Sequence, residues 1–391
     1  MIFTLLILVI CLALLALLLI RRGEYFSPDL VTIAIWVVIF ILALVSRYHG
    51  YFFVDQLLAI VGWIFVFVIV GFITRKVDFE GSKVQYSIKS NFLFITVSAL
   101  CSLYVLLYLR EIVNYLGGDW LNLFFKLRQL AEEERQVVGP LIYVKNLLLI
   151  SFYLELLNRQ GKLYRKVIYC TLIITIAVLL MEKGYLIKLA IGFLFIYGGS
   201  FKVSVTKLFV VFFVLFYTSY LFNTLRFNSS YETYDTLGFV NIYVLSPTLL
   251  FQEAESNSSK ETGFESFSFF YEVFNKVSPY EIASAEKRKP YDYVAGYRGN
   301  THTALYPYYK DFGIKGVFIA ALIISLFSFF IYEKSKTNDF YKVFYCFILY
   351  NLIFQFFQNE FSYSISNLLQ VIIILVVVNF FNSNEPRCSK Y

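Results

Sequence analysis

Long apolar runs recur along the whole chain, and they constrain its fold more than any other feature. The hydrocarbon core of a bilayer is about 30 Å thick, so a helix needs roughly 20 apolar residues to cross it. The sequence therefore predicts an all-α polytopic integral membrane protein with about eleven transmembrane helices. The runs are 2–20, 30–46, 52–73, 91–109, 140–157, 167–181, 185–199, 208–225, 312–332, 343–358 and 363–381.

Composition excludes the other large classes of protein. Of the 391 residues, 59% are hydrophobic and 16% are charged, whereas a soluble domain carries about 25% charged residues. The chain is too apolar to be disordered. Its five cysteines lie in apolar runs or in the polar tail, which does not indicate a disulfide framework. The net charge of +7 indicates basic loops beside a lipid bilayer rather than a nucleic-acid partner.

Basic residues predict the orientation, because loops on the cytoplasmic side carry an excess of Lys and Arg. Arg21 and Arg22 follow the first apolar run, which places the N-terminus outside. With alternating sides, the inside loops hold Lys and Arg at more than twice the density of the outside loops, and the C-terminus lies in the cytoplasm. The predicted inside segments are 21–29, 74–90, 158–166, 200–207, 333–342 and 382–391.

The spans and loops predict three parts along the chain: helices one to eight in 1–225, a large outer loop at 226–311, and helices nine to eleven with a tail in 312–391. The outer loop at 110–139 has apolar residues at helical spacing, which predicts an interfacial amphipathic helix. The apolar stretch 237–251 is too short to cross and contains a proline, so a re-entrant or interfacial helix is favoured over a span.

Several cations lie close to the predicted outer membrane face. A ring of cations there would suit an anionic head group such as lipid phosphate or pyrophosphate, which the arginine fork binds with two hydrogen bonds. The alternative is that long basic side chains extend toward water from the ends of their helices. These residues are Arg47, Arg110, Arg226, Lys145, Lys188 and Lys315.

The end of the large loop holds the densest set of chemically active side chains. Arginine can stabilise the charge of a departing phosphate, histidine can move a proton near neutral pH, and tyrosine can stack against sugars. The alternative is a solvated basic loop with interfacial tyrosines. The candidates are Lys287, Arg288, Lys289, Arg298, Asn300, His302, Tyr306, Tyr308, Tyr309 and Asp311.

An Arg-x10-Gly spacing occurs in both long outer loops. Arg128 precedes Gly139 and Arg288 precedes Gly299 at the same interval, and Arg135 competes with Arg128 as the functional residue. Gly139 would release the chain into the next span, and Gly299 would allow a tight turn. No spacing of His and Cys indicates a metal site, so neither a metal nor another cofactor is expected.

The chain resembles the O-antigen polymerases, a family of membrane enzymes of the bacterial periplasm. The number of spans and the long late outer loop are similar to that family. The best local match runs from Asn300-Thr301-His302-Thr303 through Tyr308-Tyr309-Lys310 to Asp311-Phe312-Gly313 and Gly316, which looks like the family's Asp-Phe-Gly-x-x-Gly stretch. The paired Arg-x10-Gly spacing also resembles one in arginine-rich periplasmic loops of some members.

The resemblance implies a glycosyltransferase of the bacterial inner membrane that serves lipopolysaccharide or related polysaccharide biosynthesis. Donor and acceptor would both be oligosaccharides on undecaprenyl pyrophosphate, and a chain-length regulator in the membrane would be a further partner. Arg226, Arg288 and Arg298 would hold the leaving pyrophosphate, and His302 would act as base or orient the acceptor. Arg128 or Arg135 would hold the acceptor's pyrophosphate. Asn300, Tyr306 and Asp311 complete the expected substrate-binding set.

Two other functions fit part of the pattern. An O-antigen ligase would use the same donor but transfer it to lipid A core, and the sequence separates the two poorly. A flippase or other transporter would place ionisable residues in mid-span to line an aqueous path, and such residues are nearly absent here. A membrane acyltransferase would be expected to show a repeated His or paired His/Asp motif, and none is obvious.

Overall fold

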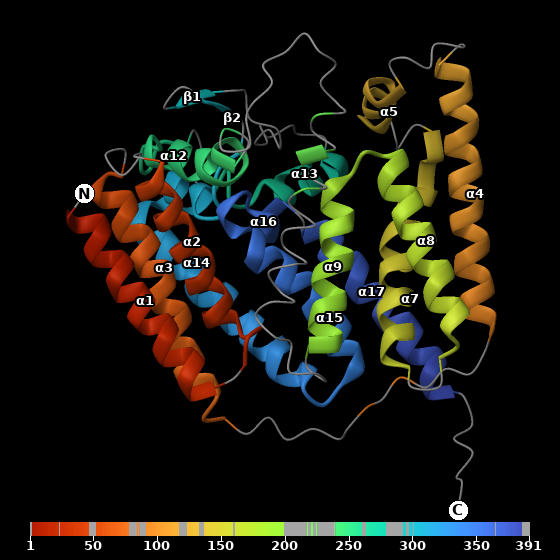
Figure 1. Cartoon of the computed structure of the whole chain (residues 1–391), viewed down its shortest axis with the longest axis horizontal. Coiled ribbons are helices and arrows are strands. Elements are labelled where there is room, and N and C mark those ends of the chain that lie inside the picture. Colours follow the sequence, from red (N-terminus) through yellow and green to blue (C-terminus); the bar gives the residue numbers. More distant parts are fainter. Residues whose placement is uncertain are drawn as a thin grey trace, which may run out of the picture. The chain divides into compact units, whose positions relative to one another are not determined.

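The computed structural model is almost entirely helical over the residues that it describes (Figure 1). In part of these ranges only the backbone is described. The described residues are 2–22, 24–46, 52–77, 84, 86, 91–116, 123–132, 137–158, 161–198, 217, 220–221, 224, 238, 240–259, 263–278, 292–294, 297–299, 301–363 and 365–384.

Helices occupy all the predicted spans except 208–225, which lies outside the described residues apart from isolated helical positions. Five of the described helices are long and apolar enough to cross a membrane. Among the others, α8 and α9 have 17 and 16 residues, so each is only about 25 Å long. The main helices are α1 (Ile2–Arg22), α2 (Pro28–Val45), α3 (Val54–Thr74), α4 (Asn91–Leu116), α7 (Val144–Leu157) preceded by the turn η2 (Gly139–Tyr143), α8 (Leu163–Leu179), α9 (Lys183–Gly198), α14 (Tyr306–Ser335), α15 (Asp339–Ile353) and α17 (Ile365–Asn384).

The chain forms two compact units, and each unit draws on segments that are far apart in the sequence. Unit 1 comprises Met1–Glu80, Asp235–Lys334 and Ile348–Ser366, and unit 2 comprises Gly81–Tyr234, Ser335–Phe347 and Asn367–Tyr391. The three-part division expected from the sequence describes order along the chain, whereas the two units describe packing.

Unit 1 is built around α1, α2, α3 and α14. Aromatic side chains fill its core, and Trp36, Phe40, Trp63 and Phe67 are fully buried. Short elements complete the unit: η3 (Asn241–Leu245), α12 (Ser246–Gln252), α13 (Ser268–Val277), β1 (Asp292–Val294), β2 (Tyr297–Gly299), η4 (Phe354–Phe356) and α16 (Glu360–Tyr363). The antiparallel pair β1–β2 is a small addition to the all-α architecture that the sequence predicts.

Unit 2 is built around α4, α7, α8 and α9, with the first part of α15 and nearly all of α17. Tyr104, Tyr108, Tyr153 and Tyr345 are fully buried in it. The helix α5 (Leu123–Glu132) packs beside α4, and it confirms that the outer loop 110–139 contains a helix. The Leu127 and Leu130 side chains of α5 are buried, so this part of its apolar face packs on its own unit.

The surfaces of the long helices are apolar while several polar side chains are buried. On α14, Ile319 and Ile323 are 61% and 62% exposed, whereas Ser325 and Ser328 are fully buried. Water favours the opposite arrangement, because exposed apolar area is costly there. Together with the five long apolar helices, this pattern indicates a membrane protein.

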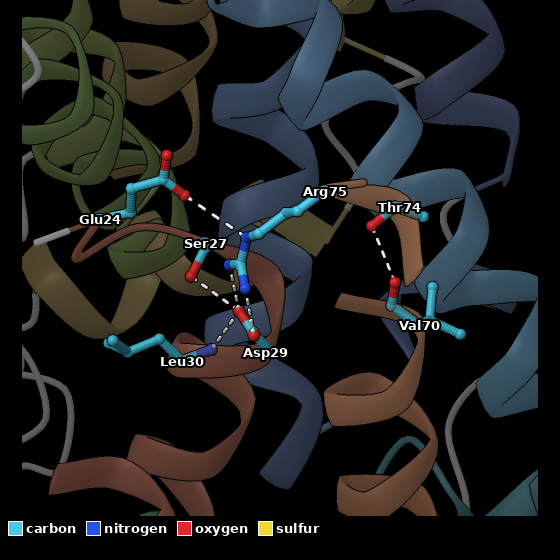
Figure 2. A network of polar contacts seen from close by, with 7 residues as sticks. All are labelled: Glu24, Ser27, Asp29, Leu30, Val70, Thr74 and Arg75. Carbon is cyan, nitrogen blue, oxygen red and sulfur yellow. Dashed lines mark hydrogen bonds and ion pairs between the residues drawn. The ribbon is translucent and has the colours of Figure 1, made fainter. Parts of the chain in front are cut away.

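A polar clasp joins one end of α2 to one end of α3 in unit 1 (Figure 2). Arg75 at the end of α3 donates from both terminal nitrogens to the two carboxylate oxygens of Asp29, each at 2.9 Å. Ser27 Oγ and the Leu30 amide also donate to Asp29 Oδ1, at 2.7 and 2.9 Å. Glu24 forms a longer ion pair with Arg75 at 3.6 Å. The clasp fixes two segments that the charge pattern assigns to the same membrane side.

The opposite end of unit 1 contains the short elements. Ser46 after α2 donates to Asn241 Oδ1 at 2.9 Å, and Gln252 Oε1 accepts from the Phe53 amide at 3.1 Å. The segment 237–251 therefore packs on the ends of α2 and α3. Its described parts η3 and α12 follow one another directly over 241–252, twelve residues in all, which is fewer than the roughly 20 needed to cross a bilayer. Pro247 lacks an amide proton and lies just after the wide turn η3.

Unit 2 groups its loops in the same way. At one end, the Tyr86 amide donates to Asp339 Oδ2 at 2.8 Å, and Arg165 donates to Asn91. At the other end, Lys145 forms an ion pair with Glu182 at 2.9 Å. Within unit 2, these contacts therefore join described loop segments at each of its two ends.

Candidate functional site

Polar side chains gather where α14 begins, at the end of unit 1 that carries the short elements. The first turns of α14 contact the loop that precedes α13, although some 45 residues separate the two segments. This group is called the α14 cluster below. It consists of Ser259, Glu265, Ser266, His302, Tyr306, Lys310 and Asp311.

Asp311 anchors the loop to α14. Its carboxylate accepts hydrogen bonds from the backbone amides of Glu265 and Ser266 at 3.2 and 2.7 Å, and from the Ser259 hydroxyl. The residue is only 9% exposed. Because a buried carboxylate is stabilised by several donors, Asp311 holds the loop in place. The sequence assigned Asp311 to substrate binding, whereas the contacts described here are with its own chain.

Lys310 neutralises a second buried carboxylate. Its Nζ lies 3.1 Å from Glu265 Oε1 and donates to the Tyr306 hydroxyl oxygen at 3.1 Å. The Glu265 side chain is 2% exposed and that of Lys310 is 26% exposed. A buried carboxylate requires such a partner. The Lys310 side chain is therefore the more exposed member of the pair.

His302 lies against Tyr306. The two ring centroids are 4.0 Å apart with an angle of 31° between the ring planes, and His302 is half-buried. Tyr306 thus connects the imidazole to Lys310 and, through it, to Glu265. The contact with Tyr306 limits the orientations that the imidazole ring can adopt.

Gly313 interrupts α14 just after the cluster. Its φ of 62° and ψ of −156° lie in a region that is essentially restricted to glycine. The backbone carbonyl of Lys310 accepts a hydrogen bond from the Ser258 amide at 2.9 Å. The kink thus leaves this carbonyl available to the loop that precedes α13. At Gly316, a Cβ atom would lie 2.5 Å from both the backbone carbonyl oxygen of Tyr308 and the Cβ atom of Phe312. The glycines of the Asp-Phe-Gly-x-x-Gly stretch therefore shape the backbone.

Arg298 lies on the hairpin, four residues before His302. Its backbone is paired with Tyr293 across the two strands, and the hairpin packs against α12. Four residues reach at most about 14 Å, so the Arg298 backbone is close to the α14 cluster. Its side chain is outside the described residues. Gly299 lies in β2 opposite Asp292 rather than in the expected tight turn.

For the remaining predicted site residues, the structure describes no side-chain contacts. Arg226, Arg288, Arg135 and Asn300 lie outside the described residues. Arg128 is in α5 of unit 2, where only its backbone is described. The assignment of these arginines to two pyrophosphate groups therefore remains a prediction.

The outer cations differ in their surroundings. Lys145 is neutralised by Glu182, which favours a structural role for it. Arg110 and Lys315 are exposed and Lys188 is half-buried, while Arg47 and Arg226 lie outside the described residues. Gly139 has a φ of +55° with open space around it, as expected where the chain is released into the next helix.

Sequence reasoning missed Glu265 and Lys310 as members of the site. Lys310 stands inside the matching Tyr-Tyr-Lys-Asp-Phe-Gly stretch, and that position was a usable signal. Glu265 carries no local signal, because its importance comes from a contact with a residue 45 positions away. Among the described residues, no group of three or more His, Cys, Asp or Glu side chains could hold a metal ion.

Comparison of the chain with protein-family models, with curated proteins and with solved structures gives no match.

Proposed function

We propose that this protein is a glycosyltransferase that polymerises oligosaccharide repeat units linked to undecaprenyl pyrophosphate. The observation that carries the proposal is the α14 cluster. The described part of the segment that resembles the O-antigen polymerases, residues 301–316, contributes His302, Tyr306, Lys310 and Asp311 to a polar cluster at the start of a long apolar helix. In a membrane-spanning α14, this start would lie close to the lipid head groups.

The proposed topology has eleven spans in the bacterial inner membrane, with the N-terminus in the periplasm and the C-terminus in the cytoplasm. The density of Lys and Arg in the loops supports this orientation. The grouping of loops supports it too. The clasp between Asp29 and Arg75 joins two predicted inside segments, whereas α12, α13 and the α14 cluster belong to the predicted outside loop.

In the proposed reaction, a terminal hydroxyl of the acceptor attacks the anomeric carbon of the donor. The bond from that carbon to the pyrophosphate oxygen breaks, and undecaprenyl pyrophosphate leaves with the electron pair. Arg226, Arg288 and Arg298 hold this pyrophosphate, and Arg128 or Arg135 holds that of the acceptor. His302 takes the hydroxyl proton or orients the hydroxyl.

The α14 cluster contributes positioning. Tyr306 fixes the His302 ring by direct contact, and Lys310 fixes Tyr306 through its hydroxyl. Because pyrophosphate is already a good leaving group, cations that bind it supply most of the required stabilisation. The proposal therefore includes no metal or other cofactor.

The flippase alternative has less support. A transporter places charged groups in mid-span along an aqueous path. The buried charged pair Asp29–Arg75 lies at the ends of its helices. The ligase alternative uses the same donor chemistry. It is distinguished from the polymerase by the polysaccharide that remains in cells carrying the Arg298→Ala variant, described next.

Arg298→Ala is the variant that tests the proposal. A charge-assisted contact is worth about 1.5–3 kcal/mol, and a tenfold rate change corresponds to about 1.4 kcal/mol. We therefore expect polymer synthesis to slow by roughly ten- to a hundredfold, with normal protein in the membrane. Arg298→Lys should restore only part of the rate, because a point charge replaces a fork. The matched control is Lys276→Ala, at an exposed lysine of the same loop.

The products separate the alternatives. Gel analysis of surface polysaccharide should show lipid A core that carries single repeat units, because a separate ligase still acts on unpolymerised donor. Loss of the single units as well would favour the ligase. Accumulation of repeat units on the cytoplasmic leaflet would favour a flippase. Unchanged polymer would show that Arg298 has no role in the reaction.

A further inference from the structure

The helix α13 directs its apolar side chains away from the protein. Apolar residues recur three or four positions apart along it, so they share one face. This face is called the α13 stripe. Its residues and their exposed fractions are Phe267 49%, Phe270 56%, Val273 44%, Phe274 45% and Val277 82%.

Apart from the exposed Lys276, the polar residues of α13 are less exposed than the residues of the stripe. Ser268 is 1% exposed, and Tyr271, Glu272 and Asn275 are half-buried. A helix on a water-soluble surface has the reverse arrangement, with its apolar face toward the core. The α5 helix provides a contrast, because its Leu127 and Leu130 are buried. The surroundings of the α13 stripe must therefore be apolar.

Contacts within unit 1 fix the depth at which α13 lies. Phe267 of the stripe packs on Phe312, the residue before the kink in α14, with ring centroids 6.3 Å apart. Beyond the kink, α14 exposes Ile319 and Ile323, which face lipid if α14 crosses the membrane. The α13 stripe thus starts beside Phe312, at the end of α14 that precedes its exposed apolar residues.

We infer that α13 is an interfacial helix whose stripe inserts among the lipid acyl chains of the leaflet at which α14 begins. The packing of Phe267 on Phe312 attaches the stripe to the start of a helix whose exposed side chains are apolar, and this favours bilayer lipid as the occupant. This inference rests on a membrane-spanning α14 and is independent of glycosyl transfer.

The insertion of α13 fixes the depth of the preceding loop relative to the lipid bilayer. Glu265 and Ser266 lie immediately before α13 and bind Asp311 and Lys310. An inserted α13 therefore holds the α14 cluster at the level of the lipid head groups. A lipid-linked substrate meets the cluster there without leaving the membrane.

Spin labels on the full-length protein in lipid nanodiscs test the inference. The native cysteines are replaced by alanine, and single cysteines are placed by Phe270→Cys and Val277→Cys on the stripe. Glu255→Cys, at an exposed residue of the same end, is the matched control. Collision with molecular oxygen reports an apolar environment, and collision with a nickel chelate reports water. We expect the ratio of oxygen to nickel collisions to be several-fold higher at 270 and 277 than at 255.

Two results would overturn the inference. Equal ratios at the three positions would place the stripe in water. Labels at 270 and 277 that meet neither reagent would show that protein covers the stripe, either a second copy or another partner. Because the cysteine-free chain could misfold, the unmodified protein is also photolabelled with a phospholipid that carries a diazirine in its acyl chain. Labelling of Phe270 or Val277 in the peptide 263–278 is expected, and its absence contradicts the inference.

Discussion

Gly313 is the residue whose identity the candidate site depends on most directly. Its backbone conformation, with φ 62° and ψ −156°, separates the polar start of α14 from its apolar part. Two consequences follow from this conformation. The Lys310 carbonyl is available to the Ser258 amide, and Asp311 faces the amides of the loop before α13.

Gly313→Ala should destabilise the protein by about 1–3 kcal/mol, because a side chain is strained in this conformation. Thermal unfolding in detergent measures the loss. Gly313→Asn should not restore stability, since asparagine tolerates the left-handed helical region but not this value of ψ. The control is Lys315→Ala, an exposed position two residues on, which should change stability by less than about 0.5 kcal/mol. Equal stability of Gly313→Ala and the control would refute the assigned conformation.

The sequence singled out several of the residues that the structure brings together at the start of α14, but not the contacts that they make there. The matching stretch identified His302, Tyr306 and Asp311, and the structure brings all three to the start of α14. The anchoring role of Asp311 could not be predicted, because its partners are backbone amides some 45 residues away. Glu265 was missed for the same reason.

The helices α2 and α3 show how elements are joined in unit 1. Asp29 is fully buried in the first turn of α2, where the positive end of the helix dipole favours a carboxylate. Gly71 of α3 allows the close approach, since a Cβ atom there would lie 2.7 Å from Asp29 Oδ2. Arg75 then completes the pair with two hydrogen bonds.

Arg75→Gln should lower the free energy of unfolding by about 3–5 kcal/mol, because it leaves the Asp29 carboxylate buried without its cation. Adding Asp29→Asn to this variant should recover part of the loss, since the unpaired charge is then removed. Lys76→Gln is the matched control, because Lys76 is the exposed basic neighbour. Chemical denaturation of the detergent-solubilised protein provides the values. If Arg75→Gln and Lys76→Gln lowered the free energy of unfolding by the same amount, the clasp would make no specific contribution to stability.

Elements with a long periodic or apolar signal could be predicted, and short ones could not. The runs 30–46, 52–73 and 312–332 became α2, α3 and the main part of α14. Their hydrophobic burial dominates any local preference. The pair β1–β2 has three residues per strand and its placement depends on packing against α12. The α13 stripe resembles a core-facing helix in the sequence, and only the structure shows that it faces outward.

At the scale of the whole molecule, the division into two units could not be predicted from the order of spans. Unit 1 combines the first three helices with α14, and unit 2 combines α4 to α9 with parts of α15 and α17. Contacts between distant spans depend on shape complementarity of apolar side chains, and hydropathy carries no information about such partners. The charge pattern predicts on which side of the membrane each loop lies, and that orientation stays a prediction.

We propose that this chain alone extends a lipid-linked polysaccharide. The most direct measurement uses the purified protein in proteoliposomes with an undecaprenyl-pyrophosphate-linked repeat unit, in the presence of a metal chelator. We expect a ladder of products that differ by one repeat unit, and release of undecaprenyl pyrophosphate in proportion to the linkages formed. The proposal would be contradicted if the repeat unit remained single, if transfer required lipid A core, or if the repeat unit only crossed the bilayer.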